Sequence, residues 1–257
     1  MFAAGKTAGA AAAVAATYIE DVFSTYLYTG NDAYQAINNG IDLAGKGGLV
    51  WSKSRATAGG QFFYDSARGA TTGNAKSLTS TSTAAQVTTY PNSMNFTSSG
   101  FELTSNANSP GNLNASGETA VSWTFRKQPK FFDVVTWTGD GVAGRQIAHS
   151  LGSTPGAIIV KCTSTARDWA VWQNTLSDGT YLKLNTTDSV ITNTSFQVFG
   201  DASGQTSTYF TVGKSGSGVN GLTNASGSTY VAYLFAHNAG GFGLTGTDNV
   251  ISCGSFT

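Results

Sequence analysis

Side chains that could carry acid–base chemistry are few and scattered in this sequence. There are three glutamates, Glu20, Glu102 and Glu118, and most aspartates stand beside glycine or asparagine, a context that favours turns. A glycosidase needs two carboxylates held roughly 5–10 Å apart, and no cluster of acidic residues predicts such a pair. We therefore expect no hydrolytic site of this type.

Nucleophilic, metal and cofactor chemistry also lack a recognisable pattern. The two histidines, His149 and His237, stand in unrelated turn-like contexts, and no G-x-S-x-G elbow is present. The two cysteines, Cys162 and Cys253, lack the close Cys or His spacing of a zinc site. Glycine-rich stretches such as Gly45–Gly48 lack the phosphate-loop spacing. The sequence predicts a protein without catalytic residues, metal or cofactor.

The charge content excludes two further classes. Lys and Arg number 14, Asp and Glu number 14, and charged residues make up only 11% of the chain, where about 25% is usual. This balance provides no basic surface for a phosphate backbone, so we expect no nucleic-acid partner. No apolar run approaches the roughly 18 residues of a membrane-spanning helix, so we expect no membrane partner.

Composition and periodicity predict an all-β fold. The chain has 32 glycines and only four prolines, and it is rich in threonine, serine and asparagine, which suits short strands joined by tight turns. Apolar and small or polar residues alternate from Thr119 to Phe125, as in a strand with one buried face. The continuous apolar run Leu49–Trp51 is typical of a central strand buried on both sides.

An internal repeat predicts two similar domains. The turn Asn114–Gly117 and the strand after it recur about 110 residues later, beginning at Asn224–Gly227. A repeat of this length with about eight short strands predicts an antiparallel β-sandwich of the jelly-roll or lectin-like kind. The expected units are an N-terminal helix at residues 1–22, sandwich domains at 23–132 and 133–243, and the opening strand of a further domain or a linker at 244–257.

The first 22 residues are dominated by alanine and predict a short helix from Ala3 to Val22. Such a segment has little apolar area with which to anchor itself, so we expect it to dock on a partner chain. Its docking contacts would come from its larger apolar side chains, Phe2, Val14, Tyr18 and Ile19. The alternative is a helix folded back on its own domain.

Aromatic residues are the one candidate binding feature. Sugars stack on exposed rings within a neutral, hydroxyl-rich surface. The candidate glycan contacts are Trp169, Trp172, Phe62, Phe63 and Tyr64. The alternative is that these rings belong to strand cores, as Trp51, Trp123 and Trp137 are expected to do.

The first repeat resembles a known family. It contains, in order, the run Leu49–Lys53, the D-x-x-R-G element within Tyr64–Ala70, the segment Leu78–Ala85, the G-F-x-L strand in Ser99–Leu103, and Asn114–Trp123. This order resembles a segment of tail-fibre and other appendage proteins of tailed bacteriophages, particularly marine and cyanobacterial phages. The resemblance covers most of residues 23–132, and the second repeat lacks the D-x-x-R-G element.

Within that element, Asp65 and Arg68 are spaced to clamp a turn through a charge-assisted hydrogen bond, which is a structural role. The resemblance implies a virion structural protein located in a tail appendage, oligomeric and commonly trimeric. It also implies attachment to other tail proteins through the N-terminus and distal parts that face the host. It brings no catalytic residues. Two other functions remain open: a carbohydrate-binding module for host polysaccharide, and a head-decoration protein.

Overall fold

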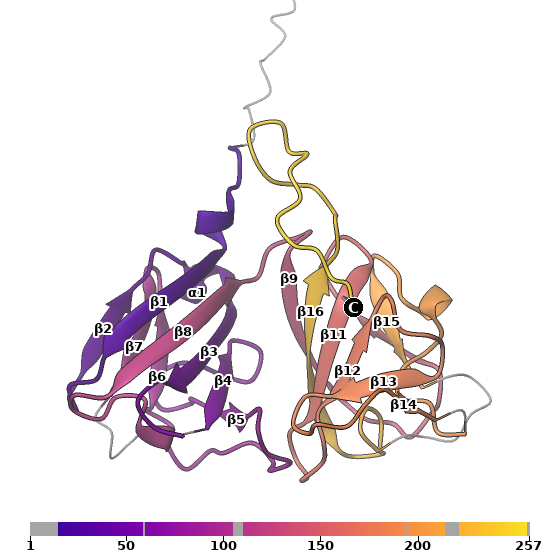
Figure 1. Ribbon diagram of the computed structural model, residues 1–257, viewed down its shortest axis with the longest axis horizontal. Helices are drawn as coiled ribbons and strands as arrows, with labels where there is room; N and C mark the ends of the chain where they lie inside the picture. The colour runs from indigo at the N-terminus through magenta and orange to yellow at the C-terminus, as the bar shows by residue number, and fades with distance from the viewer. Residues whose placement is uncertain (1–14, 59, 105–109, 194, 214–220, 256–257) are drawn as a thin grey trace, which may run out of the picture.

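The protein is built almost wholly of antiparallel β-strands (Figure 1). The computed structural model describes residues 15–58, 60–104, 110–193, 195–213 and 221–255. Within these ranges the strands form four sheets, which pack in two pairs and enclose two apolar cores. The all-β class predicted from the sequence is confirmed.

The first sandwich, residues 23–126, pairs a five-stranded with a three-stranded sheet. The larger sheet has the order β1 (Phe23–Thr29), β8 (Thr119–Arg126), β3 (Gly48–Ser54), β4 (Gln61–Asp65), β5 (Leu78–Thr79). The smaller has the order β2 (Gln35–Asn38), β7 (Gly100–Leu103), β6 (Met94–Thr97). The short helices are α1 (Leu43–Lys46) and η3 (Pro110–Asn112).

The second sandwich, residues 132–236, pairs a six-stranded with a two-stranded sheet. The larger sheet has the order β14 (Ile191–Thr192), β13 (Thr180–Lys183), β12 (Ala170–Gln173), β11 (Pro155–Cys162), β16 (Thr229–Ala236), β9 (Phe132–Thr138). The smaller contains β10 (Arg145–Ala148) and β15 (Tyr209–Val212), and the 3-10 helix η4 (Ala202–Gly204) lies before β15.

The two sandwiches share their topology and register. In each, the first strand pairs with the last, and the last pairs with the third, as β1-β8-β3 and as β9-β16-β11. Thr29 lies opposite Thr119, and Thr138 lies opposite Thr229. The asparagine that occurs in both repeats makes an equivalent contact in each. The Asn114 side-chain amide donates to the Ala33 carbonyl at 2.6 Å, and the Asn224 side-chain amide donates to the Val142 carbonyl at 2.7 Å.

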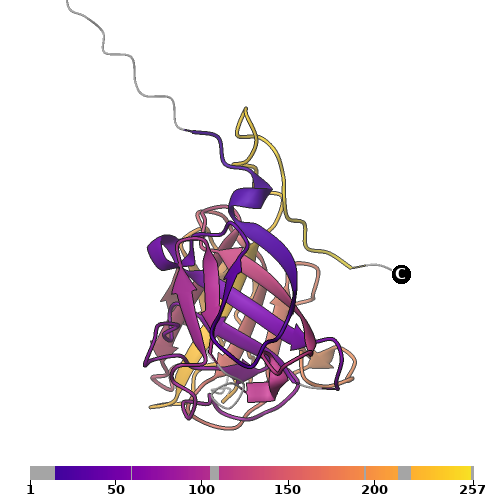
Figure 2. The same ribbon diagram turned by 90° about the vertical axis from the view of Figure 1, so that its left-hand side faces the viewer.

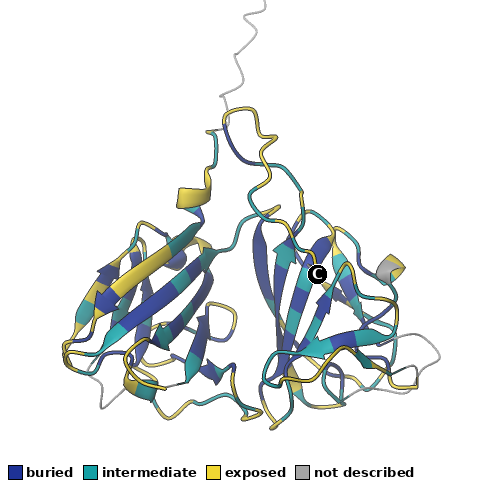
Figure 3. Ribbon diagram, viewed as in Figure 1, coloured by how far each residue is buried: buried dark blue, intermediate teal, exposed yellow. Residues whose placement is uncertain are grey.

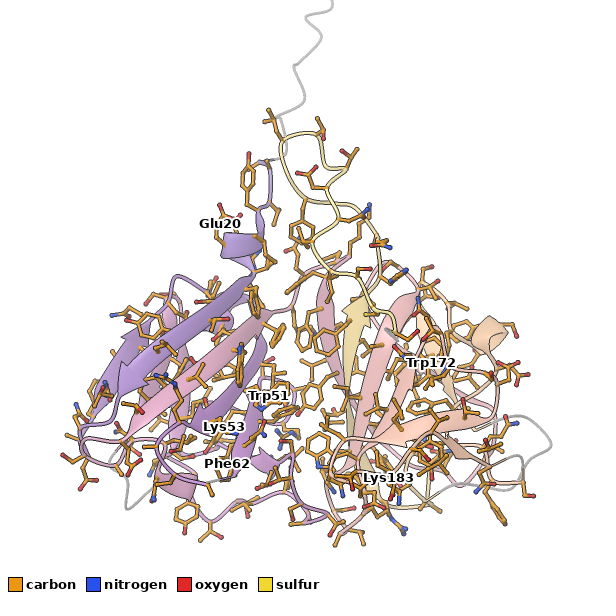
Figure 4. The ribbon with its side chains drawn as sticks, viewed as in Figure 1. Glu20, Trp51, Lys53, Phe62, Trp172 and Lys183 are labelled. Carbon is orange, nitrogen blue, oxygen red and sulfur yellow. The ribbon has the colours of Figure 1, made fainter. Side chains whose placement is uncertain are left out.

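The two large sheets turn their outer faces toward each other, so β9, β11 and β16 are largely buried in Figure 3. Strand β4 contributes apolar side chains to both faces of its sheet, since successive strand residues point to opposite faces. Phe62 and Tyr64 enter the core of the first sandwich, whereas Phe63 enters a third cluster with residues of the second. In Figure 4, Trp51 lies between the sandwiches as part of this third cluster.

The N-terminal segment departs from the prediction of a helix over residues 3–22. Residues 15–18 have no regular structure, and η1 (Ile19–Asp21) is a single 3-10 turn. The turn is closed by a hydrogen bond of 2.7 Å from the Tyr18 amide to the Asp21 carboxylate. Val22, which follows the turn and precedes β1, is fully buried. Residues 1–14 lie outside the described residues.

In its described part, the C-terminal segment does not form an opening strand, which was one of the two expectations for residues 244–257. Residues 244–255 contain no strand and fold back instead, with the Asn238 amide bonded to the Ile251 carbonyl at 3.0 Å. The amide of Gly243 donates to the Thr17 carbonyl at 2.9 Å. The segments before β1 and after β16 therefore lie together at one end of the molecule, as Figures 1 and 2 both show.

Candidate functional site

The contact between the sandwiches, which we call the inter-sandwich interface, has an aromatic centre. The Phe63 ring meets the rings of Trp169 and Tyr233 edge-on, each with centroids 5.2 Å apart. All three side chains are at most 1% exposed. Because edge-to-face pairs of buried rings add stability beyond their burial, this cluster stabilises the contact between the two sandwiches.

A buried polar cluster lies beside these rings. The Asp65 carboxylate accepts from the Arg68 amide at 2.8 Å and from Arg68 Nε at 2.6 Å, which is the turn clamp expected from the sequence. The hydroxyl of Tyr233, from the second sandwich, donates to Asp65 Oδ2 at 2.7 Å. Arg68 Nη2 donates to the Phe63 carbonyl at 3.0 Å. The clamp therefore extends across the inter-sandwich interface.

Burial and charge act against each other in this cluster. Burial disfavours the Arg68 cation, but the Asp65 charge and hydrogen bond prevail and raise the pKa of Arg68 above its ordinary value. Burial also raises the pKa of the Tyr233 hydroxyl well above its ordinary value. Arg68 Nη1 is buried and has no hydrogen-bond partner among the described residues. The cluster thus stays ionised at Arg68 and protonated at Tyr233 at neutral pH.

A second set of contacts fixes the segment after β5 to the second sandwich. Trp169 Nε1 donates to the carbonyls of Thr79 and Ser82, each at 3.1 Å. Lys161 Nζ donates to the Thr83 carbonyl at 3.1 Å and to that of Cys162 at 2.9 Å. Burial lowers the pKa of Lys161 to about 8. These carbonyls replace part of the hydration that the ammonium loses on folding.

A cavity of about 400 Å³, which we call the inter-sandwich cavity, opens at the edge of this interface. The first sandwich lines it with Ala67, Arg68, Lys76 and Gln86, and the second lines it with Thr136, Trp137, Thr138, Thr163, Thr229 and Tyr230. These residues of β9 and β16 stand at the ends farthest from the linker between the sandwiches, since Thr138 ends β9 and Thr229 begins β16. The cavity is therefore remote from the two terminal segments.

The aromatic residues expected to contact a glycan are buried. Trp169 and Tyr64 are at most 1% exposed, Phe63 is 1% exposed, Trp172 4% and Phe62 6%. Phe62 lies in the first core and Trp172 in the second (Figure 4). Tyr64 also lies in the first core, and Phe63 and Trp169 lie in the inter-sandwich interface. None presents the open ring face that sugar stacking needs, so the expectation of exposed platforms is wrong for all five.

The candidate docking residues are only partly described. Tyr18 is 42% exposed and Ile19 is 36% exposed, which leaves both accessible to a partner. Phe2 and Val14 lie outside the described residues. An apolar hollow of about 280 Å³ adjoins Ile19 and is also lined by Phe23, Phe125, Phe131, Val250 and Ile251.

Sequence reasoning missed Tyr233 and Lys161 as members of the interface. One signal was present for Tyr233: β16 is apolar on both faces, with Ala232 and Leu234 entering the second core and Tyr233 facing the first sandwich. Such a run indicates a strand covered on both sides. No sequence pattern predicted the role of Lys161, because its two partners are backbone carbonyls, one 78 positions away at Thr83 and one on the adjacent Cys162.

The described residues contain neither a metal-ligand cluster nor a membrane-spanning helix. No group of three or more His, Cys, Asp or Glu side chains there could hold a metal ion. No described helix is long and apolar enough to cross a membrane. The inter-sandwich cavity brings together polar groups from both sandwiches.

Comparison with known proteins assigns a family. Neither the curated proteins nor the solved structures contain a match to this chain. A family model described as a domain of unknown function, DUF7483, matches residues 19–249. The match begins at η1 and runs past β16, so it covers both sandwiches as one unit. The chain therefore belongs to the DUF7483 family.

Proposed function

We propose that this protein is a structural component of a tailed-phage virion, located in a tail fibre. The observation that carries the proposal is the inter-sandwich interface, which has its own apolar cluster and a buried ion pair completed by Tyr233. Buried aromatic and hydrogen-bonded contacts join the two sandwiches as one stiff unit. Stiffness suits an appendage that holds distal groups at a set distance from the particle.

The placement of the terminal segments supports attachment through the N-terminal side. The chain before β1 meets the segment after β16 through the bond between Gly243 and Thr17. The opposite end of the second sandwich carries the inter-sandwich cavity, lined by Thr138 and Thr229. A partner tail protein that holds the N-terminal segment would leave the cavity end free to face the host.

Surface features support assembly with further copies of the chain. Strand β1 is an edge strand, and its residues Tyr26 and Leu27 are 36% and 58% exposed. An exposed apolar edge strand can pair with another chain. Because the surface carries few charges, electrostatic repulsion between copies opposes such pairing only weakly. The resemblance to tail fibres favours a homotrimer, which light scattering of the purified chain tests directly.

Location is tested on purified phage particles. We expect the protein among the peptides of washed particles, and antibody raised against residues 23–255 should label the tail in electron micrographs. A matched variant lacks residues 2–14 and should fold but fail to join particles. This deletion spares Val22, which is fully buried and whose carbonyl accepts from the Arg126 amide. Label on heads would favour a decoration protein, and absence from particles would refute the proposal.

A second candidate function, carbohydrate binding, is favoured by one observation. The inter-sandwich cavity brings threonine hydroxyls, a glutamine and two cationic side chains together. Because the candidate aromatic rings are buried, binding would depend on these polar groups. Isothermal titration of the purified chain against saccharides tests this function independently of virion location.

A further inference from the structure

The inter-sandwich cavity contains cationic groups whose interactions are incomplete. Two of the side chains that line it carry a full charge, Arg68 and Lys76. The Arg68 side chain is only 3% exposed; Asp65 holds its Nε and the Phe63 carbonyl holds its Nη2. Its Nη1 has no hydrogen-bond partner within the described part of the chain. A buried donor of this kind is costly unless a ligand or water satisfies it.

Lys76 adds an uncompensated charge. It is partly buried, and its ammonium makes no ion pair with any described residue. Asp65 already neutralises Arg68 through their contact at 2.6 Å. The charged groups around the cavity therefore sum to one positive charge, which matches a monoanion such as a carboxylate better than a dianion.

Hydrogen-bonding groups without charge occupy the rest of the cavity wall. Gln86 Oε1 is buried and has no hydrogen-bond partner among the described residues. The hydroxyls of Thr163 and Thr229 lie 2.6 Å apart and bond to each other. Thr136 and Thr138 are exposed at the cavity rim. Hydroxyls both donate and accept, so this wall suits a ligand that itself carries several hydroxyls.

The open edge of β9 adds backbone acceptors. The Val134 carbonyl accepts from Lys127 Nζ at 3.5 Å, and the Thr138 carbonyl accepts from Arg145 Nη1. Both donors lie outside β16, so these carbonyls point away from it, toward the unpaired edge. Because alternate residues of a strand share an edge, the Thr136 carbonyl points the same way, and Thr136 is one of the residues that line the cavity.

We propose that the inter-sandwich cavity binds a hydroxylated carboxylate of the kind found in acidic saccharides, with the carboxylate near Lys76 and Arg68 and the sugar hydroxyls on the threonines and Gln86. A volume of about 400 Å³ lies within the range of small-molecule sites, which starts at roughly 300 Å³. The proposal deepens the carbohydrate-binding function and rests on it. It does not depend on where the protein is located.

The test is titration calorimetry of the full chain with galacturonate, which carries a single carboxylate, with neutral galactose and with glucose 6-phosphate as comparisons. We expect saturable binding of the uronate alone. Lys76→Met should weaken that binding at least about tenfold, as the loss of a charge-assisted hydrogen bond does. Thr138→Val should weaken it less, and the exposed Lys46→Met should leave it unchanged.

Three outcomes would overturn the proposal. The first is no saturable uronate binding by the wild type. The second is an equal loss in the Lys46 and Lys76 variants, which would indicate attraction by general surface charge. The third is equal or tighter binding of the neutral sugar or the sugar phosphate. Near-ultraviolet circular dichroism confirms that each variant is folded, and tail labelling, measured separately, decides the virion location.

Discussion

Replacing Tyr233 by phenylalanine removes one hydroxyl from the centre of the inter-sandwich interface. That hydroxyl donates to the buried Asp65 carboxylate at 2.7 Å, and hydrogen bonds to charged groups contribute about 1.5–3 kcal/mol. The phenyl ring retains the contacts with Phe63 and Trp169, so no packing is lost. We expect Tyr233→Phe to lower the free energy of unfolding by about 2 kcal/mol.

Equilibrium unfolding in guanidinium chloride measures this change, followed by tryptophan fluorescence and far-ultraviolet circular dichroism. Tyr26→Phe is the matched control, because the Tyr26 hydroxyl makes no hydrogen bond with the described residues and its ring is 36% exposed. It should alter the free energy by less than about 0.5 kcal/mol. Equal midpoints for wild type and Tyr233→Phe would refute the role assigned to this contact.

Three further changes test other parts of the fold by the same unfolding measurement. Lys161→Met should remove a pH dependence from the free energy of unfolding. Folding lowers the pKa of Lys161 to about 8, so keeping the buried side chain protonated destabilises the wild type below that pH. This cost shrinks as the pH rises from there toward the pKa of the unfolded chain. The stability difference, variant minus wild type, should fall by about 2 kcal/mol between pH 7 and roughly pH 9.5, and a constant difference would contradict this. Asn224→Ala removes the side-chain bonds to the Val142 carbonyl, the Asp140 carboxylate and the Asp140 amide and should cost about 2–3 kcal/mol in total, whereas a neutral effect would mean that water replaces the amide. Gly139→Ala places a Cβ against the Ala225 carbonyl oxygen and should cost about 1–3 kcal/mol; unchanged stability would mean that the turn can move.

Local pattern predicted strands well because a strand's alternation follows from its own residues. Thr119–Phe125 alternates as expected and forms most of β8. Its apolar face, however, is not the face that lines the core of the first sandwich. Ala120 enters that core, and Thr124 bonds to Asn39 on the same side, while Phe125 packs in the inter-sandwich interface. Periodicity identifies a buried face but does not name its partner.

The candidate site could not be predicted because its partners are distant in sequence. Trp169 is bonded to carbonyls 90 and 87 positions earlier, at Thr79 and Ser82, and nothing near Trp169 indicates that a segment from the other sandwich will cover it. The Asp65 and Arg68 clamp was predictable, since three residues separate its members. Its continuation to Tyr233, across a separation of 168, was not.

Divergence between the two repeats explains why the pair of sandwiches, and not one of them, is the unit of this fold. Asp65 ends β4 and Arg68 lies in the turn after it, and the second repeat has no such element. Tyr233 lies opposite Ile159 in its sheet, as Trp123 lies opposite Trp51 in the first, so a second copy of the first sandwich would bring tryptophan where Asp65 needs a hydroxyl. The outer face of each large sheet is thus complementary to that of the other sandwich and not to a copy of itself. This favours the pairing within the chain over self-association through this face. A family match that covers both sandwiches agrees with that pairing.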